Sequence, residues 1–459
     1  MKTIISGFGC VCALGDNISQ ITKNLFSLNA EPSFPSDRLS SSYSNQYPVF
    51  QVSGNILSKK REDESFSYLF LRTAIDEALF CAGLSAENLK NVRVGVCIGT
   101  TVDVSFNCFD FYKNWKQNKN PPLDPLNKYI HYSTAREVIK NYGFANAFGQ
   151  TVVTACASGT DAIGIAGQWI ENGLCDVAIA SGCDELNLIP YTGFIKLMIA
   201  ETKPCKPFDK NRTGINLGEG AGVFIMVSEK FANANQTCQG DGGVDNHSGQ
   251  GDGGSDHSFV VNCSVPLTTV ATHNSSTPKR IGTLLGYGNA ADAYHATAPE
   301  PNGRGLRKAL QSALTESGLI QSGQGDGGVD HKGVVTSSVP LTTKLAFVNA
   351  HATGTKDNDA AEAGVFNSLL NGVPISATKS LTGHCLGAAG AVEACLSLIC
   401  LNEGKIPKTK NFETPDDALS GIVPVSEETK IDKTKAAVST SLAFGGCNSA
   451  IVLKGRAES

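Results

Sequence analysis

The chain has 459 residues, 41% of them hydrophobic, which is enough to build more than one compact core. Its 38 basic and 43 acidic residues nearly cancel, so neither nucleic acid nor an anionic membrane surface is expected as a main partner. The 15 cysteines are scattered through apolar stretches, a pattern typical of reduced, buried thiols in the cytoplasm and not of a secreted disulfide framework.

Strands and helices alternate from the beginning of the chain. A strand is expected over Thr3–Gly9, and apolar residues at helical spacing predict a helix over Phe66–Cys81. The stretch RVGVCIGT at 93–100 and the β-branched run Thr151–Val153 each predict a buried strand. This alternation indicates an α/β fold.

The stretch QTVVTACASGTDAI places Cys156 at a corner between a strand and a helix. Small residues follow the cysteine, and Asp161 falls in the expected first helical turn. Unpaired N–H groups and the helix dipole at such a corner favour a thiolate, so Cys156 is a candidate nucleophile. The alternative is a small cysteine buried at a tight turn.

Two related stretches interrupt the alternation, at 237–279 and at about 322–343. Both contain a GQGDGG-type or QGDGG-type repeat and then SVPLTT, and both are poor in apolar residues. Insertions of this kind in surface loops cost little stability. The first insertion separates two predicted halves, 1–236 and 280–459. The repeats are not stacked in tandem, so no metal site is expected there.

Removing the insertions reveals an internal duplication. RVGVCIGTT at 93–101 is similar to KLAFVNAHATGT at 344–355, and TVVTACASGTDAIGIA at 151–166 is similar to ISATKSLTGHCLGAAG at 375–390. The pattern predicts two duplicated α/β halves that share one site, with Cys156 at a corner of one half and His384 at the matching corner of the other.

Two histidines stand out because each lies at a strand-end corner beside glycine and threonine, namely His351 and His384. Neutral imidazoles whose Nε2–H donates can stabilise a developing enolate, while a thiolate can accept an acyl group from a thioester. Lys379 precedes His384 and can orient a histidine or act through its charge. Glu393, on the following helix, is the expected ion-pair partner of this lysine.

Six separated stretches resemble the elongating β-ketoacyl-[acyl-carrier-protein] synthases of the thiolase-like superfamily. They are TACASGTDAI, KPFDKNRTGINLGEGAG, GYGNAADAYHATAPEPNG, VNAHATGTKDNDAAE, TKSLTGHCLGAAGAVEA and SLAFGGCNSA. The resemblance runs almost end to end, apart from the insertions and the aromatic stretch Thr101–Trp115. It implies a thiolase-like fold, with the two halves in a layered αβαβα arrangement.

The resemblance also implies a 3-oxoacyl-[acyl-carrier-protein] synthase that condenses an acyl group on Cys156 with malonyl-carrier protein and releases carbon dioxide. His351 and His384 would assist decarboxylation and stabilise the enolate, with Lys379 in support. The backbone N–H groups of Cys156 and Phe444 would form the oxyanion hole, and Phe444 would also act as a gate. The implied phosphopantetheine-binding residues are Thr353 and Thr355, and the implied supporting network is Glu393, Asp359 and Glu362.

The implied partner is acyl carrier protein, which brings its own phosphopantetheine arm, so no free cofactor and no metal are expected. A cytoplasmic homodimer is expected, or a heterodimer with a related subunit. The longest uncharged apolar run, near Cys395–Leu401, is far short of a bilayer's thickness, so no membrane span is expected.

Several alternatives stay open at this point. The pathway could be primary fatty acid synthesis or a specialised polyene or type II polyketide pathway. A non-catalytic chain-length subunit is disfavoured, because such subunits lack the nucleophilic cysteine. Cys447 raises a thiolase as a rival, since degradative thiolases use a second cysteine near the C-terminus; we expect Cys447 to be a packing residue. The aromatics of Thr101–Trp115 suggest a short, planar or unsaturated acyl chain.

Overall fold

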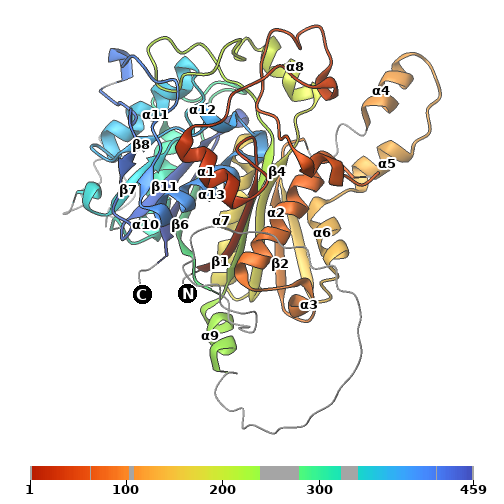
Figure 1. The fold of residues 1–459 in the computed structure, drawn as a ribbon, viewed down its shortest axis with the longest axis horizontal. Coiled ribbons are helices and arrows are strands. Elements are labelled where there is room, and N and C mark those ends of the chain that lie inside the picture. The colour runs from red at the N-terminus through yellow and green to blue at the C-terminus, as the bar shows by residue number, and fades with distance from the viewer. Residues whose placement is uncertain are drawn as a thin grey trace.

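A large mixed sheet forms the framework of the molecule in a computed structural model (Figure 1), which describes residues 3–62, 64–102, 108–237, 279–321, 340–419 and 421–456. Its order is β3-β2-β4-β5-β1-β6-β12-β11-β7-β8. The strands are β1 (Thr3–Val11), β2 (Val94–Gly99), β3 (Ala147–Val152), β4 (Val177–Asp184), β5 (Gly220–Val227), β6 (Gly282–Ala291), β7 (Leu345–Asn349), β8 (Ile375–Ser376), β11 (Ala436–Leu442) and β12 (Cys447–Gly455). A separate pair joins β9 (Lys405–Ile406) to β10 (Thr429–Lys430).

The helices cover both faces of this framework and also fill its middle (Figure 1). They are α1 (Ile18–Ser27), α2 (Phe66–Ala82), α3 (Ala86–Leu89), α4 (Phe109–Lys116), α5 (Asp124–His131), α6 (Thr134–Tyr142), α7 (Ser158–Glu171), α8 (Leu188–Lys196), α9 (Glu229–Thr237), α10 (Arg304–Glu316), α11 (Lys356–Leu369), α12 (Lys379–Thr382) and α13 (Ala389–Glu403). The predicted helix at 66–81 is α2, which ends at Gly83 in the left-handed conformation.

Five layers result, which confirms the predicted αβαβα arrangement. On the outside, α2 packs on β1, β4 and β5, while α10 packs on β6 and β12 at the opposite side. Between the two halves of the sheet, α7 packs on β2 and β4, and α13 packs on β5 and β11. The middle helices contact each other, so both are buried on nearly all sides and need the small and apolar residues that the sequence provides.

The duplication is visible in the order of the strands. Reading outward from the central β1–β6 pair, one half runs β5-β4-β2-β3 and the other runs β12-β11-β7-β8. In each half the two outermost strands are parallel, and the edge strand leads into a middle helix. The two middle helices therefore begin at matching places, on either side of one shared site.

The middle layer depends on glycines. A Cβ at Gly390 in α13 would overlap with Thr160 Oγ1, which is hydrogen-bonded to Ser441 Oγ at 2.8 Å. We therefore expect Gly390→Ala to lower the free energy of unfolding by about 1–3 kcal/mol through overpacking. Gly364→Ala is the matched control, since a Cβ there meets nothing within 4 Å and alanine favours the helix. Urea unfolding of both variants checks this, and equal stabilities would contradict tight packing of α7 against α13.

One expectation needs correction. The run Thr151–Val153 was expected to be a buried strand, but β3 is an edge strand that is mostly exposed, and Val153 is 65% exposed. A β-branched run identifies a strand but not its place in the sheet. The segment Leu386–Glu403 has the length and composition of a membrane span, but 89% of it is buried in the fold, as in a core helix. The predicted insertions at 237–279 and about 322–343 lie, apart from their ends, outside the described residues, which leave out 238–278 and 322–339.

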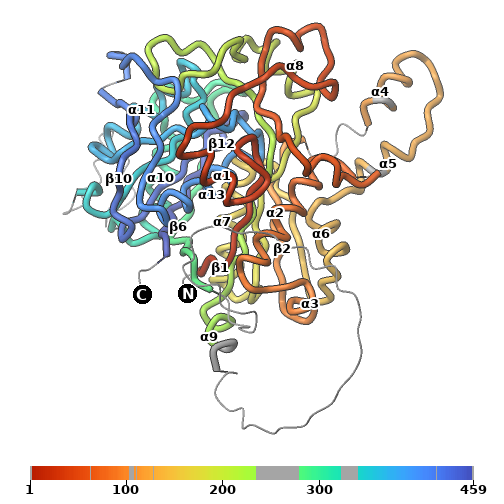
Figure 2. The backbone as a smooth tube through the Cα atoms, in the orientation of Figure 1, coloured from red at the N-terminus to blue at the C-terminus, as the bar shows by residue number. Residues whose placement is uncertain are grey.

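The segment with helices α4 and α5 lies at one side of the molecule, as the tube view shows (Figure 2). Helices α4 and α5 project from the body there, beyond α6. Tyr112 and Trp115 of α4 are 51% and 60% exposed. The aromatic stretch is therefore a surface feature over its described part, which excludes residues 103–107.

Candidate active site

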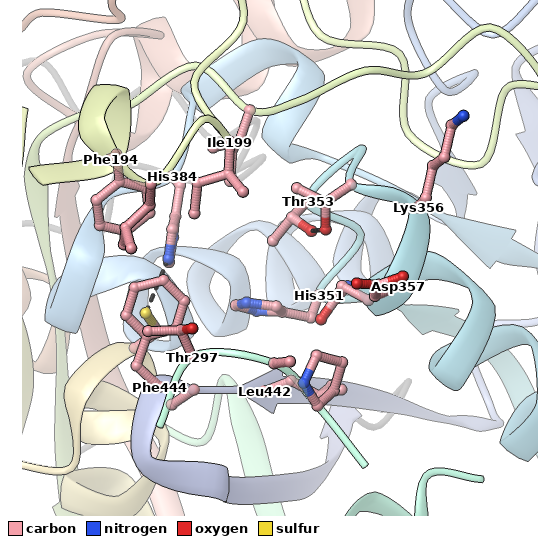
Figure 3. A pocket seen from close by; sticks show the side chains of 18 of the residues that line it. Phe194, Ile199, Thr297, His351, Thr353, Lys356, Asp357, His384, Leu442 and Phe444 are labelled. Carbon is pink, nitrogen blue, oxygen red and sulfur yellow. Dashed lines mark hydrogen bonds between the residues drawn. The ribbon is translucent and has the colours of Figure 1, made fainter. Parts of the chain in front are cut away.

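A cavity of about 480 Å³ lies where the two halves meet. It brings together the predicted Cys156, His351 and His384 with Thr353, Thr355 and Phe444 (Figure 3). The remaining lining residues are Phe194, Leu197, Met198, Ile199, Thr213, Ile215, Asp292, Thr297, Ala298, Pro299, Lys356, Asp357, Asn358, Leu442, Ala443 and Asn448.

Cys156 lies in the 3₁₀ turn η4 (Ala155–Ala157), immediately before α7. Ala155 has a φ of 50°, and Ser158 Oγ donates to the Ala155 carbonyl at 2.6 Å, so the corner is tightly fixed. The thiol is 2.9 Å from Nε2 of His384. The backbone N–H groups of Phe444 and Cys156 lie close enough to the sulfur to lower the pKa of the thiol. Two preorganised N–H donors at the nucleophile are the arrangement that can stabilise an oxyanion.

The electrostatic state of Cys156 differs from the expectation of a ready thiolate. Burial raises the pKa of the thiol to about 12, although the charge of Lys379 and the N–H group of Phe444 lower it. The start of α7 therefore does not by itself ionise the thiol. His384 Nε2 is the group in place to receive the proton.

The raised pKa of Cys156 predicts slow alkylation of the protein in its unacylated state. Iodoacetamide reacts with thiolate, and a pKa of about 12 in place of 9.0 makes the thiolate about a thousandfold scarcer at pH 8. The rate should rise roughly tenfold per pH unit from pH 7 to 10 without a plateau. Mass spectrometry of the Cys156 peptide, with free cysteine as reference, measures this. A plateau below pH 9 would show instead a pre-formed thiolate.

His351 follows β7 and contacts a buried lysine. Lys379 Nζ lies 3.1 Å from His351 Nδ1 and forms an ion pair with Glu393, and the lysine side chain is fully buried. An ammonium group only donates, so Nδ1 of His351 accepts and its proton is on Nε2. The ring thus offers an Nε2–H donor, as expected from the sequence.

Both imidazoles are neutral at neutral pH. Burial, followed by the charge of Lys379, lowers the pKa of His351 and of His384 well below the ordinary value. Their rings are 5.2 Å apart and nearly perpendicular. A protonated Cys156 thiol donates to Nε2 of His384, so in the resting state the two rings differ in tautomer, and only His351 offers an Nε2–H.

Two of the predicted supporting carboxylates, Glu362 and Asp359, lie outside the cavity and hydrogen-bond to the backbone near His351. Glu362 accepts the backbone N–H groups of His351 at 2.8 Å and of Ala352 at 2.6 Å, where Ala352 has a φ of 46°. Asp359 accepts the N–H of Phe208 at 2.8 Å and of Gly354 at 3.2 Å. Burial raises the pKa of Glu362 to about 7 and that of Asp359 to about 6. Neither carboxylate lines the cavity. Both instead hold the backbone around His351 in place by accepting its N–H groups.

Thr353 and Thr355 lie side by side in the cavity wall, with their hydroxyl oxygens 2.9 Å apart. Phe444 stacks on Phe194, with ring centroids 5.3 Å apart, and both rings lie on the same side of the cavity as His384 (Figure 3). Gly445 and Gly446 follow Phe444 with φ values of 80° and 76°, a backbone that other residues rarely adopt.

Sequence profiles of two protein domains match the chain. Residues 2–232 match the β-ketoacyl synthase N-terminal domain, and residues 335–413 match the β-ketoacyl synthase C-terminal domain. The chain belongs to the β-ketoacyl synthase family. Within this family of condensing enzymes, the first profile alone covers half of the chain.

Full-length relatives agree with this assignment. The synthase is 28% identical to a Schizosaccharomyces pombe protein provisionally named mitochondrial 3-oxoacyl-[acyl-carrier-protein] synthase, over 99% of each chain. It is 26% identical to 3-oxoacyl-[acyl-carrier-protein] synthase 2 of Staphylococcus aureus, over 99% of this chain and 98% of that protein.

Solved structures share the fold of the synthase. The ishigamide ketosynthase/chain length factor superimposes with a TM-score of 0.78 at 22% identity, over 99% of both chains. A β-ketoacyl synthase from Burkholderia phymatum gives a TM-score of 0.74 at 22% identity, over 99% of this chain and 100% of that one.

The structure corrects the expected equivalence of Cys156 and His384. The matching 3₁₀ turn of the second half is η6 (Leu386–Ala388), where Leu386 has the same left-handed backbone as Ala155. The residue equivalent to Cys156 is therefore Gly387, and His384 comes three positions earlier. The sequence similarity located the corner but not its exact register.

Sequence reasoning missed two features of the synthase site. Asp184, at the end of β4, accepts the N–H of Gly387 at 2.6 Å and the hydroxyl of Thr100 at 2.6 Å, and so ties the two halves together. A carboxylate directly after a buried strand was the available signal. Phe194 of α8 comes from a stretch without a recognisable pattern, and only packing brings it to the cavity.

Cys447 does not line the cavity; it begins β12 and its carbonyl accepts the N–H of Ala443 at 2.8 Å. The aromatics Tyr112 and Trp115 do not line it either. Within the part of the chain that the structure describes, no group of three or more His, Cys, Asp or Glu side chains is arranged to hold a metal ion.

Proposed function

We propose that the chain is a 3-oxoacyl-[acyl-carrier-protein] synthase, an acyltransferase that forms a carbon–carbon bond. The observation that carries this proposal is the meeting of Cys156, His384 and His351 in one buried cavity, with two backbone N–H groups at the sulfur. A nucleophile, a proton acceptor, a neutral donor and an oxyanion site are the parts that thioester condensation requires.

In the first half-reaction, Cys156 attacks the thioester carbonyl of an acyl-carrier protein. Its proton passes to Nε2 of His384, and the N–H groups of Cys156 and Phe444 hold the oxyanion. The carbon–sulfur bond to the carrier then breaks, and the carrier thiolate takes the proton from Nε2 of His384 as it leaves. Cys156 carries the acyl group.

In the second half-reaction, malonyl-carrier protein loses carbon dioxide, and the electron pair of the broken bond forms an enolate. The thioester oxygen of this enolate accepts the Nε2–H of His351, whose orientation depends on Lys379. Once Cys156 is acylated, His384 Nε2 has no thiol proton to accept. The neutral ring with its proton on Nε2 in place of Nδ1 is then the second donor. The enolate carbon attacks the acyl-Cys156 carbonyl, and the carbon–sulfur bond to Cys156 breaks. The products are the 3-oxoacyl-carrier protein and the Cys156 thiolate, which takes up one proton from solvent to restore the thiol.

The remaining expectations belong to the same proposal. Acyl carrier protein supplies the phosphopantetheine arm, Thr353 and Thr355 hydrogen-bond it, Phe444 gates the malonyl group, and neither a free cofactor nor a metal takes part. The thirteen free cysteines among the described residues support a reducing compartment, and we assign the protein to the cytoplasm.

We further propose a dimer. Strand β3 is an open sheet edge. Phe148 in the strand is 40% exposed, and Val153, directly after the strand, is 65% exposed. An unpaired edge is a template for a second strand. A second copy, or a related subunit, would cover this edge. Among the structural neighbours, the ishigamide protein is a ketosynthase/chain length factor.

Acylation of the protein by a panel of acyl-carrier proteins tests the proposal. Intact-protein mass spectrometry should find one acyl group per chain, on Cys156, and addition of malonyl-carrier protein should remove it as a 3-oxoacyl product. Saturated chains would support fatty acid synthesis, whereas preferred polyene or polyketide chains would support the specialised alternative. An unmodified Cys156 with every carrier would overturn the proposed function.

A further inference from the structure

We propose that Lys356 binds the phosphodiester of the phosphopantetheine arm at the entrance of the cavity. This inference rests on the proposed function and assigns a binding role to a residue that the sequence did not single out. The ligand group is a monoanionic phosphodiester, which arrives with every carrier-bound substrate whatever its acyl chain.

The charge of the cavity is the first argument. Among the described residues that line it, Lys356 is the one lysine or arginine. The arm is neutral along its length and carries its anionic group at the end away from the thioester. Two carboxylates, Asp292 and Asp357, also line the cavity, and Asp292 accepts the backbone N–H groups of Glu300 and Gly305. Lys356 is therefore the lining side chain whose charge is opposite to the single negative charge of the arm.

The position of Lys356 is the second argument. Lys356 follows Thr355 directly, and its side chain is exposed, whereas His351 and His384 are buried. Seen from the sulfur and His384, Lys356 lies beyond Thr353, and its ammonium group points outward (Figure 3). An arm with its thioester at Cys156 and its amides at Thr353 and Thr355 thus brings its phosphate to the Lys356 end.

The surroundings leave this ammonium group available. Among the described residues, no ion pair or hydrogen bond engages Lys356 Nζ. The nearby cations are committed, because Lys206 pairs with Glu413 at 2.8 Å and Arg212 pairs with Asp416 at 2.5 Å. Asp357 is the neighbouring acid, but its carboxylate points away from the Lys356 amine, towards the side of His351 (Figure 3).

The N-terminus of helix α11 adds to the positive electrostatic potential around Lys356. Lys356 is the first residue of α11, a helix of 14 residues whose N-cap Thr355 makes no side-chain cap hydrogen bond. The positive end of the helix therefore lies beside the Lys356 side chain and favours an anion at the same place.

Steady-state kinetics with three acyl donors test the inference. The donors are an acyl-carrier protein, the same acyl group on free phosphopantetheine, and the same acyl group on N-acetylcysteamine, which has no phosphate. With Lys356→Gln, we expect KM to rise roughly three- to tenfold for the first two donors and to stay unchanged for the third, with kcat unchanged. Lys356→Arg should restore most of the affinity. Lys308→Gln, on the exposed face of α10, is the charge-matched control.

Each outcome has one meaning. A higher KM for the carrier protein alone would overturn the inference in favour of an acidic side chain of the carrier as the partner of Lys356. An unchanged KM for all donors, or a higher KM for the N-acetylcysteamine donor as well, would also overturn it, while the wild-type activity would leave the proposed function standing. Absence of wild-type turnover with all three donors would overturn the proposed function itself.

Discussion

Replacement of Cys156 by alanine is expected to abolish condensation, with kcat/KM falling by about 10³-fold or more. The methyl group cannot form the thioester, so the acyl chain has no covalent attachment beside the N–H groups of Cys156 and Phe444. Assaying the two half-reactions separately shows which step the substitution affects. Acyl transfer from the carrier should disappear in intact-mass spectra, while malonyl decarboxylation retains His351 and its Nε2–H donor.

Cys447→Ala is the matched control for this prediction. Cys447 is half-buried and outside the cavity lining, so its loss should change kcat/KM by less than about threefold. Urea unfolding establishes that both variants are folded. If Cys447→Ala lost activity as completely as Cys156→Ala, a thiolase-type role for a second cysteine would replace the decarboxylating mechanism.

Lys379→Met is expected to have the largest effect on stability. The lysine is fully buried and paired with the buried Glu393, so its removal leaves an unpaired carboxylate in the core. Breaking a buried pair in this way typically costs about 3–5 kcal/mol of unfolding free energy. The variant should also lose activity, since Nδ1 of His351 loses its donor and the tautomer of the ring is no longer fixed.

The pH dependence of Lys379→Met has a defined sign. Burial raises the pKa of Glu393 to about 7 even with Lys379 present, and loss of the positive charge raises it further. The folded variant then binds this proton more tightly than the unfolded chain, so its free energy of unfolding should rise as pH falls from 8 to 5. Urea midpoints at a series of pH values measure this, and a fall in stability over that range would contradict the assignment.

Lys379→Met combined with Glu393→Leu separates stability from catalysis. The double variant replaces both charges by apolar groups of similar volume and should recover most of the lost stability. It should remain inactive, because His351 still lacks its partner. Recovered condensation in the double variant would show that the ion pair is structural only.

Much of the fold followed from local patterns in the sequence. Strand β2 and helix α2 lie where their residues predict them, and Gly83, a residue typical of helix ends, follows α2 as its C-cap. The similarity between 151–166 and 375–390 correctly indicated a duplicated fold, because each segment must form the same strand, turn and helix. The grouping of Cys156, His351 and His384 followed from their places at strand ends.

Contacts between residues far apart in the chain could not be predicted from the sequence. The exposure of Val153 depends on which strands flank β3, and the contact of Phe194 with Phe444 depends on how α8 folds over the cavity. The protonation of Cys156 was also mispredicted. A helix start was visible in the sequence, but the depth of burial that raises the pKa of the thiol is a property of the assembled halves.

The Gly387 corner explains why the duplicated fold holds one reaction centre. A side chain at Gly387 would meet Asp184 Oδ2 and the backbone of Thr100, each at 2.7 Å. The place where a second nucleophile would stand is thus filled by the carboxylate that ties the halves together. The two corners therefore have different roles. The Cys156 corner binds the acyl group, and the Gly387 corner packs against Asp184 and stabilises the junction of the halves. Each chain can therefore carry one acyl group at a time, and a dimer carries two, one for each pair of halves.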